Sequence, residues 1–336
     1  MNPMKRYRSR RAFVAALAGS LAVPLRGWTQ ATRRPDKVTV AGWSKPITEI
    51  TPLLVDEDKG FYRDEAIELG YVPGAGGGDA IRNILTGQAD VAFTDPGSFF
   101  AAIDKGEKLL AIYDIYPQNV FNVVSLKGSN ISKPEDLKGR RVGVYSLASG
   151  TRQNLLVLLN QVGLAESDVT IVVTGILNFA PLLQGQVDAT AATDTGLLVA
   201  RRRGIGEVDV MEVGRYLNVS SDLFVVREEV YQRRKEVLRR FLKAYRNSAA
   251  WMIGNAEEAA TLAAVRAIDG TDPALNLEII RLRNAATVSE LTRTNGLGWM
   301  DAASLQRAAA AYRELGLVSR SIDVADVMSQ ELLPGR

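Results

Sequence analysis

The chain has 336 residues, 46% of them hydrophobic, and carries 41 Lys and Arg against 38 Asp and Glu, a formal net charge of +3. It contains neither cysteine nor histidine. Disulfides, thiolate nucleophiles, Cys- or His-ligated metal sites and the Ser-His-Asp and Cys-His catalytic arrangements are therefore excluded.

Residues 1–31 have the composition of an export signal. They contain six basic residues and no acidic one, and their apolar run at residues 12–23 is too short to span a bilayer. Within them, SRRAFV at residues 9–14 resembles the twin-arginine export motif, although Ala15 stands where a lysine often follows. We therefore expect a signal peptide at residues 1–31 that is removed on export to the periplasm, by the twin-arginine or the general secretory route.

Removal of this segment changes the charge balance of the protein. Without its six cations, 35 basic residues face 38 acidic residues, a net charge of −3. The basic character belongs to the signal, so binding to nucleic acid is not indicated. No later segment is long and apolar enough to cross a membrane.

The mature chain opens with a predicted strand at residues 37–41, which leads into Gly42-Trp43-Ser44. A tryptophan after a strand offers a flat face to a ring or a wall to an alkyl chain. Trp43 and Ser44 are therefore candidate ligand contacts, with core packing as the alternative for Trp43.

Residues 71–100 read as strand, glycine loop, helix, strand, tight turn and helix. We expect Asp79 and Asp95 to cap the two helices, with Gly87 just past the end of the first. Two helix N-termini would then lie at one edge of a parallel sheet, where unpaired N–H groups favour a ligand. The loop lacks the third glycine of a dinucleotide fingerprint and the Lys-Ser/Thr ending of a P-loop. The candidate ligand contacts here are Gly76, Gly77, Asp79, Thr94, Asp95 and Ser98.

The same strand-to-helix pattern returns in the second half of the chain. A predicted strand at residues 140–144 leads to a turn at residues 149–151 and a helix. TGQADVAFTD at residues 86–95 and QGQVDATAATD at residues 184–194 look like a pseudo-repeat, in which Asp95 and Asp194 are equivalent. Each of these aspartates either caps its helix only or also faces the ligand. The further candidates are Gln118, Ser149, Gly150, Thr151, Arg152, Asn178, Asp194 and Asn218.

Four segments carry a family resemblance: KGFYRDEAIEL (59–69), ILTGQADVAF (84–93), PEDLKGRRVGV (134–144) and LLQGQVDATAATD (182–194). Their order and spacing resemble those of solute-binding proteins of ABC importers for nitrate, sulfonates, taurine and thiamine-type pyrimidines. The resemblance runs from about residue 38 to residue 242. It implies an α/β, two-lobed, periplasmic-binding-protein-like fold of type II, with two hinge crossings and a ligand cleft between the lobes. From the predicted strands we assign residues 36–124 and 225–336 to lobe one and residues 125–224 to lobe two, with hinges near 125–128 and 223–226.

The resemblance also implies a function. We expect a monomer that is not an enzyme and needs no cofactor or metal. It would capture a small molecule by hinge closure and deliver it to a membrane ABC permease with its ATPase. The alternatives are a receptor for a sensor kinase and a cofactor-free lyase with Asp95 or Asp194 as its base. The fungal enzyme that makes the thiamine pyrimidine shares the fold but uses a histidine and a cysteine-rich iron site, which this chain lacks.

Two sets of residues point to different ligands. Helix N-termini and Arg152 favour a sulfonate- or carboxylate-type anion, whereas Trp43 with two aspartates favours an amino-pyrimidine or another heteroaromatic compound. The balance of the two sets favours an organic anion.

Overall fold

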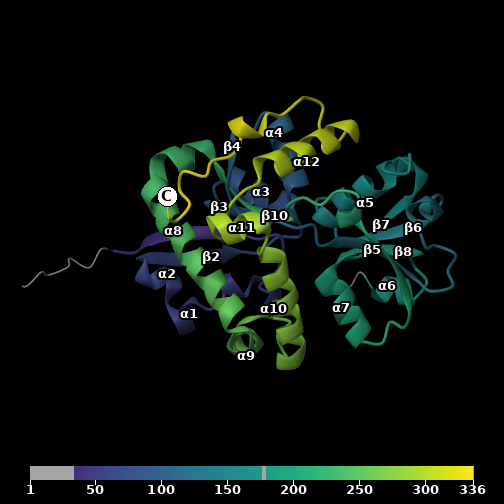
Figure 1. Ribbon diagram of the computed structural model, residues 1–336, viewed down its shortest axis with the longest axis horizontal. Coiled ribbons are helices and arrows are strands. Elements are labelled where there is room, and N and C mark those ends of the chain that lie inside the picture. The colour runs from purple at the N-terminus through teal and green to yellow at the C-terminus, as the bar shows by residue number, and fades with distance from the viewer. Residues whose placement is uncertain (1–33, 176–178, 336) are drawn as a thin grey trace, which may run out of the picture. The chain divides into compact units, whose positions relative to one another are not determined.

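The computed structural model describes residues 34–175 and 179–335, which form two α/β lobes, each built on a five-stranded sheet (Figure 1). The sheet of lobe one has the order β2-β1-β3-β10-β4. Strands β1, β2 and β3 are parallel, while β10 is antiparallel to both of its neighbours. The strands of this sheet are β1 (Asp36–Ala41), β2 (Ile67–Val72), β3 (Val91–Thr94), β4 (Leu109–Tyr116) and β10 (Asp222–Arg227).

The sheet of lobe two repeats this plan in the order β7-β6-β8-β5-β9. Again three strands are parallel, and β5 is antiparallel to β8 and β9. The third strands of the two sheets, β3 and β8, lie in the two halves of the pseudo-repeat, so both copies occupy the same place in their lobes. The strands are β5 (Phe121–Leu126), β6 (Arg141–Val144), β7 (Thr170–Val173), β8 (Ala189–Thr193) and β9 (Val208–Glu212).

The chain changes sheet twice, and each change supplies the antiparallel fourth strand of the other lobe. It passes from β4 to β5 through residues 117–120, and from lobe two to β10 through residues 216–221. The predicted lobe boundaries at 124/125 and 224/225 therefore fall inside β5 and β10. In the structure the lobes are divided at the two crossings instead. The hydrophobic pattern of a buried strand is the same whichever sheet it joins, so sequence alone did not place the change.

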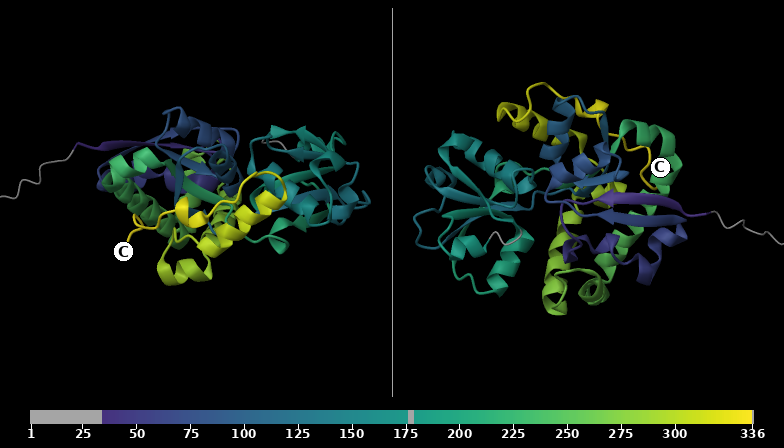
Figure 2. Two further views of the ribbon diagram at one scale, coloured as in Figure 1. Left: turned by 90° about the horizontal axis from the view of Figure 1, so that it is seen from above. Right: turned by 180° about the vertical axis from the view of Figure 1, so that it is seen from behind.

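Lobe one carries most of the helices. Helices α3 and α4 cover one face of its sheet and α8 lies against the other (Figures 1 and 2). The helices of lobe one are η1 (Thr48–Leu53), α1 (Asp56–Lys59), α2 (Phe61–Asp64), α3 (Gly77–Leu85), α4 (Pro96–Asp104), α8 (Glu228–Gly254), α9 (Ala256–Arg266), α10 (Pro273–Thr287), α11 (Glu290–Asn295), α12 (Ala302–Glu314) and η6 (Val324–Asp326). Those of lobe two are η2 (Pro134–Leu137), α5 (Gly150–Asn160), η3 (Glu166–Asp168), α6 (Ala180–Leu183), α7 (Asp194–Arg202) and η5 (Val213–Arg215).

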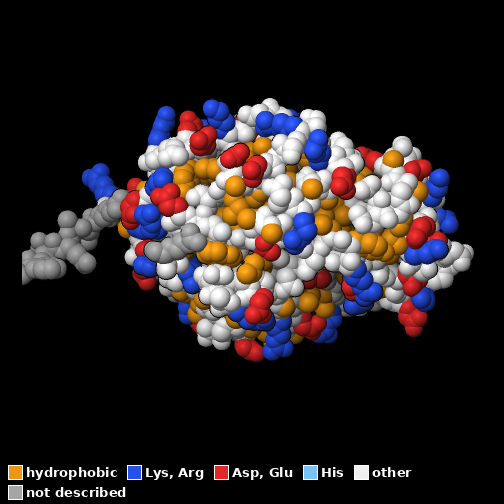
Figure 3. Space-filling model, turned by 45° about the horizontal axis from the view of Figure 1, so that its top comes forward, with side chains coloured by type: hydrophobic (Ala, Val, Ile, Leu, Met, Phe, Trp, Pro, Cys, Tyr) orange, Lys and Arg blue, Asp and Glu red, His pale blue; other side chains and the backbone are white. Residues whose placement is uncertain are grey.

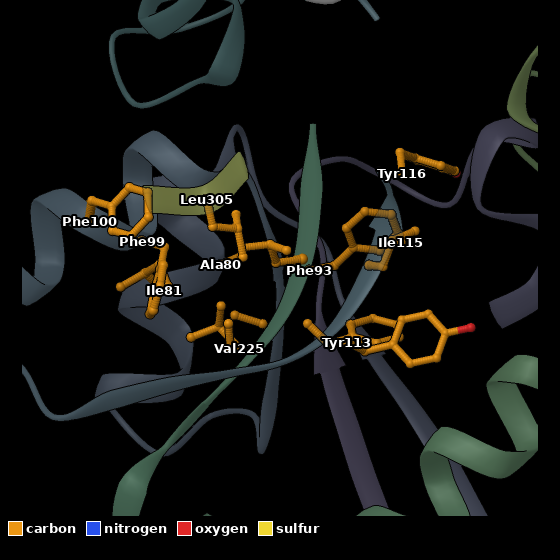
Figure 4. Packing of buried hydrophobic residues seen from close by; sticks show 14 of the residues in the cluster. Ala80, Ile81, Phe93, Phe99, Phe100, Tyr113, Ile115, Tyr116, Val225 and Leu305 are labelled. Atoms are coloured by element: carbon orange, nitrogen blue, oxygen red, sulfur yellow. The ribbon is translucent and has the colours of Figure 1, made fainter. Parts of the chain in front are cut away.

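The core of lobe one packs on both faces of its sheet. On one face, Ala80 and Ile81 of α3 pack near Val225 of β10 (Figure 4). On the other, Phe224 of β10 meets Tyr245 of α8 edge to face, with ring centroids 4.6 Å apart. A sheet buried on both faces is rigid, so the strand ends that it presents to lobe two are fixed in position.

The surface mixes charges of both signs. Blue and red side chains are interspersed on the face that Figure 3 shows, with hydrophobic side chains between them. Many of these charges are paired across elements, for example Arg266 with Asp58 and Lys59 with Glu258. Within residues 34–175 and 179–335, no helix combines the length and the apolar character of a membrane span.

Candidate functional site

A cavity of about 120 Å³ lies between the two lobes. This is small beside the roughly 300–1,000 Å³ of a usual small-molecule pocket, so the closed lobes leave room for a compact solute. Lobe one contributes Trp43, Ile47, Glu49, Gly76, Gly77, Asp95, Asp222 and Arg283; lobe two and the first crossing contribute Val120, Phe121, Tyr145, Ser149, Gly150, Thr151, Gly175, Thr193 and Gly196. We refer to this space as the inter-lobe cavity.

The lobes touch directly at one side of the cavity. The Ser146 hydroxyl donates to the Ala75 carbonyl at 2.5 Å, and the Gly78 amide donates to the Ala148 carbonyl at 3.0 Å. A Cβ atom at Gly76 would lie 2.5 Å from that carbonyl oxygen of Ala148, so the position needs glycine. The start of α3 is therefore docked on the loop before α5, and the lobes are closed on each other in this structure.

Four helices begin at the cavity: α3 and α4 from lobe one, and α5 and α7 from lobe two. The predicted edge of helix N-termini is therefore present, although the protein satisfies part of it. Asp95 caps α4, as the sequence predicted, by accepting from the Ser98 amide at 2.8 Å, and Thr193 caps α7 through the Gly196 amide at 3.2 Å. These caps leave less positive potential for a bound anion than bare helix ends would supply.

The turn before α5 is held by its own hydroxyls. Ser149 Oγ and Thr151 Oγ1 lie 2.7 Å apart, and Thr151 Oγ1 accepts from the Tyr145 amide at 2.9 Å. Ser149 Oγ also donates to the Ser146 carbonyl at 2.7 Å. This turn is therefore pre-formed, and its hydroxyls are already engaged within the protein.

A charged cluster lies where α10 meets α7. Arg283, only 1% exposed, forms an ion pair with Asp194 across the lobes, and its Nη1 lies 3.8 Å from Glu49 Oε2. Glu49 Oε1 accepts from the Thr195 hydroxyl at 2.7 Å, whereas Oε2 has no hydrogen-bond partner among the described residues. Burial raises the pKa of Glu49, and Arg283 partly opposes this. Glu49 thus holds the lobes together with one oxygen, while the other approaches Arg283 without a hydrogen bond.

Asp222 is a second acidic group of the cavity that lacks a counter-ion. It stands at the start of β10 and is 7% exposed. Its backbone carbonyl accepts from the Ser220 hydroxyl, but its carboxylate receives no hydrogen bond or ion pair from a side chain of residues 34–175 and 179–335. Burial raises the pKa of Asp222 well above its usual value, and the neighbouring Asp95, Glu49 and Asp114 raise it further. Within the same residues, no three acidic side chains are grouped so as to hold a metal ion.

Aromatic side chains supply the apolar walls. Trp43 packs edge to face on Phe93, with ring centroids 6.3 Å apart, and its Nε1–H finds no acceptor within the described part of the chain. Phe121 and Tyr145 line the cavity from the side of lobe two. A Cβ atom at Gly150 would lie 2.7 Å from Phe121 Cζ, so glycine lets this ring reach the start of α5. The cavity thus offers flat surfaces, and two of its lining residues carry a buried donor without an acceptor in the described part of the chain, Trp43 at Nε1 and Arg283 at Nε.

Seven of the predicted ligand contacts line the inter-lobe cavity. They come from three predicted segments: the end of β1, the glycine loop with the turn after β3, and the turn before α5. The seven are Trp43, Gly76, Gly77, Asp95, Ser149, Gly150 and Thr151.

Several neighbours of these residues point elsewhere. The Ser44 hydroxyl donates to its adjacent carbonyl, and Thr94 and Ser98 are buried beside Asp95 without lining the cavity. Asp79 does not cap α3, because that helix begins at Gly77 and places Asp79 in its first turn. Its carboxylate bonds back to the Ala75 amide at 3.0 Å and pairs with Arg82.

The remaining predicted contacts also have partners in the protein. Arg152 pairs with Glu166 of its own lobe and does not line the cavity. Gln118 donates to two carbonyls near the end of α10, and Asn218 accepts from the first crossing segment. Asp194 is the first residue of α7 rather than its cap, and its carboxylate faces Arg283. Asn178 lies outside the described residues.

Sequence reasoning missed Glu49, Asp222 and Arg283. Glu49 lies in a short 3-10 helix, and Arg283 lies on α10. Neither residue belongs to a strand-to-helix turn, which was the pattern that guided the search. One signal was available for Asp222, namely an acidic residue opening a strand of four buried apolar residues.

The fold and the cavity together define a class of protein: two α/β lobes that exchange one strand each and enclose a ligand site between them. This is the periplasmic-binding-protein fold. The alkanesulfonate-binding protein SsuA of Xanthomonas axonopodis pv. citri, solved with MOPS bound, superposes with a TM-score of 0.69 at 16% identity over 88% of this chain and 99% of that chain. The nitrate-binding protein NrtA of Synechocystis PCC 6803 also gives a TM-score of 0.69, at 13% identity over 89% and 87% of the two chains.

The chain belongs to the NMT1/THI5-like family, whose model matches residues 47–259. A riboflavin-binding protein, RibY of Chloroflexus aurantiacus, is 25% identical over 305 residues, which cover 89% of this chain and 86% of that protein. The 4-amino-5-hydroxymethyl-2-methylpyrimidine phosphate synthase of Schizosaccharomyces pombe is 23% identical over 60% of this chain and 61% of its own length. The expected family and the two-lobed fold are thereby confirmed.

Proposed function

We propose that the chain is an extracytoplasmic solute-binding protein that captures a small organic molecule in the inter-lobe cavity and delivers it to an ABC importer permease. One observation carries the proposal: the cavity is lined from both lobes and presents buried polar atoms, Trp43 Nε1 and Glu49 Oε2, that no described residue satisfies. Buried polar groups without partners are rare in folded proteins. A ligand that pairs with them would also hold the lobes together.

Hinge closure would follow from the connection between the lobes. The segments at 117–120 and 216–221 join them, and a ligand that contacts both sheets favours the closed arrangement. Closure would bring α7 to α10 and the loop before α5 to α3, the contacts described above. The permease would then recognise this closed pair of lobes, which a receptor role toward a sensor kinase would require as well.

Periplasmic location is part of the proposal. It is supported by the signal-like residues 1–31 and by relatives such as the taurine-binding periplasmic protein of Escherichia coli, 23% identical over 73% of this chain and 69% of that protein. Fractionation of cells that express the full chain, with and without the Arg10-Arg11 pair replaced by lysines, would test both the location and the route. Loss of export in the paired variant would assign the twin-arginine route.

Ligand capture is tested by a thermal-shift panel on the mature protein. The panel holds riboflavin, 4-amino-5-hydroxymethyl-2-methylpyrimidine, taurine, alkanesulfonates, nitrate, aromatic amines and aromatic carboxylates. A ligand at a hundred times its dissociation constant adds about 2.7 kcal/mol of stability, a rise in Tm of several degrees. We expect one class to respond, Trp43→Ala to weaken its binding by about 1 kcal/mol or more, and Arg152→Ala, outside the cavity, to leave it unchanged. A response that survives Trp43→Ala and changes in Arg152→Ala would place the ligand elsewhere.

Synthase relatives give the second candidate function, synthesis of a pyrimidine. The chain has no histidine and no cysteine to supply the groups that the resemblance implies for that reaction. Incubation of the protein with any ligand found in the panel, followed by mass spectrometry, decides between capture and turnover. Recovery of the ligand unchanged supports capture, and a new product would establish an enzyme.

A further inference from the structure

The charge of the inter-lobe cavity identifies a class of solute, provided that the cavity is the solute site proposed above. Three of its lining residues are acidic, namely Glu49, Asp95 and Asp222, and one is basic, Arg283. The helix N-termini at the cavity add partial positive charge. The question is which of these charges are already balanced within the protein.

Two aspartates have their charges balanced within the protein, without a ligand. Asp95 caps α4 with its Oδ1 on the Ser98 amide and its Oδ2 on the Ser98 hydroxyl, both at 2.8 Å. Asp194 stands at the N-terminus of α7 and pairs with Arg283. These two aspartates thus engage the ends of α4 and α7 and one side of the Arg283 guanidinium, whose Nε–H has no acceptor among the described residues.

Glu49 and Asp222 are the acidic residues of the cavity that these contacts do not balance. The nearest cation to Glu49 is the guanidinium that Asp194 already engages, 3.8 Å from Oε2, and Asp222 has no cation at all among the described residues. The groups that face them are otherwise acidic or neutral. They are Asp269 and Thr195 around Glu49, and Asp95, Asp114, Tyr116 and Tyr245 around Asp222.

We propose that the solute is a nitrogen-based organic cation or a protonated amino heterocycle, whose N–H groups bind Glu49 and Asp222 while its flat body lies against Trp43. An anion would meet two buried carboxyls without a free counter-ion, which is costly at low dielectric. The organic anion that the sequence favoured depended on Arg152, and that side chain pairs with Glu166 outside the cavity. The Trp43 Nε1–H then donates a hydrogen bond to an acceptor atom of the same ligand.

Ligand binding at these two carboxyls is also coupled to their protonation. Burial raises the pKa of both Glu49 and Asp222, and repulsion from neighbouring carboxylates adds to it, so both retain protons at a pH where an exposed carboxyl would be ionised. A cation that binds there favours their ionised forms. Binding therefore releases protons from these carboxyls to the solvent, and the released number falls when either group is replaced by its amide.

Benzamidine and benzoate are suitable probes, because they share a ring and differ in the charge of a planar substituent. We expect benzamidine, and not benzoate, to raise the Tm of the mature protein, and calorimetry in phosphate and Tris buffers to show proton release. Glu49→Gln and Asp222→Asn should each weaken benzamidine roughly tenfold or more. Asp79→Asn, an acidic residue that faces Arg82 outside the cavity, is the matched control and should leave binding unchanged.

The outcomes separate this inference from the proposed function. Binding of benzoate, taurine or another anion that is lost in Trp43→Ala would keep solute capture and overturn the cationic class. Binding of any ligand that survives both amide substitutions would overturn it as well. No binding by any member of the whole panel would count against solute capture itself.

A measurement without ligand keeps the inference testable if benzamidine fits poorly. A carboxyl whose pKa is higher in the folded than in the unfolded protein makes the protein less stable as pH rises from the unfolded-state pKa through the folded-state pKa. Asp222→Asn should therefore raise the Tm of the solute-free protein by a few degrees above pH 7 and change it little near pH 4. A lower Tm in Asp222→Asn above pH 7 would show that the carboxylate is stabilised by the protein, and the inference would fall.

Discussion

Arg283 is the side chain whose loss should most weaken the closed arrangement. It is buried, spans from α10 to Asp194 of the other lobe, approaches Glu49, and stands 5.1 Å over the ring of Tyr116. Replacement by methionine keeps most of the aliphatic volume and removes the charge. Removal of one partner of a buried ion pair costs about 3–5 kcal/mol, because the other partner stays buried without its counter-ion.

The expected cost depends on pH through Glu49. Its pKa is already raised with the arginine present, and without the arginine it rises further. Below the unfolded pKa, Glu49 is protonated in both states and the loss of Arg283 matters less. As pH rises above that value, the folded protein must either keep the proton or bury the charge, so the cost of Arg283→Met grows.

Urea unfolding and thermal melts at pH 5 and pH 8 measure this directly. At pH 8 we expect a loss of about 3–5 kcal/mol, a fall in Tm of roughly 5–10 °C for a protein of this size. The matched control is Arg202→Met, which removes an exposed ion pair with Glu278 between the same two helices and should cost below about 1 kcal/mol. Adding Glu49→Gln to Arg283→Met should recover part of the loss.

Two results would refute this reasoning. If Arg283→Met costs no more than Arg202→Met, the buried cluster contributes nothing beyond a surface ion pair. If the double variant is no more stable than Arg283→Met alone, the cost does not come from an uncompensated Glu49.

Three further predictions test other parts of the structure. Gly77→Ala places a Cβ atom 2.2 Å from Asp95 Oδ2 and should destabilise by about 1–3 kcal/mol in urea unfolding, whereas Gly254→Ala, with open space around it, should be neutral or stabilising. Burial raises the pKa of Asp114 to about 8, so the stability of the protein should fall as pH rises from about 4 to 8. Asp114→Asn should flatten that part of the stability profile. An unchanged profile would contradict this role of Asp114. Arg152→Glu should leave ligand affinity unchanged and cost about 1 kcal/mol or less; lost affinity would return this residue to the site.

Strand-to-helix turns were readable from the sequence because their determinants are local. Asp95 followed by Pro96 specifies a capped helix start, and Gly87 at φ +75° ends the preceding helix as predicted. The turn at Ser149 carries its own hydroxyl network within three residues. Each of these features depends on neighbours in the chain, so a pattern of a few letters was sufficient to find them.

Helix caps marked the limit of this local reading. The pseudo-repeat made Asp95 and Asp194 equivalent in sequence, yet α4 is capped by the aspartate and α7 by the threonine before it. Proline at the first position of α4 fixes where that helix starts, and α7 has no such residue. A one-residue shift in the start of the helix was enough to redirect Asp194 toward Arg283.

By itself, the sequence determined the two repeated α/β units, the family and the turns that edge the cavity, and it predicted an export leader. Only the tertiary structure decided which charges meet there. Glu49, Asp222 and Arg283 are separated by up to 234 positions and lie on three different elements, brought together when β10 joins the sheet of lobe one and α10 packs on η1. Burial and pairing set the energy of a charge, and both depend on neighbours that are distant in the chain. The chemical character of the site therefore became visible only in the folded molecule.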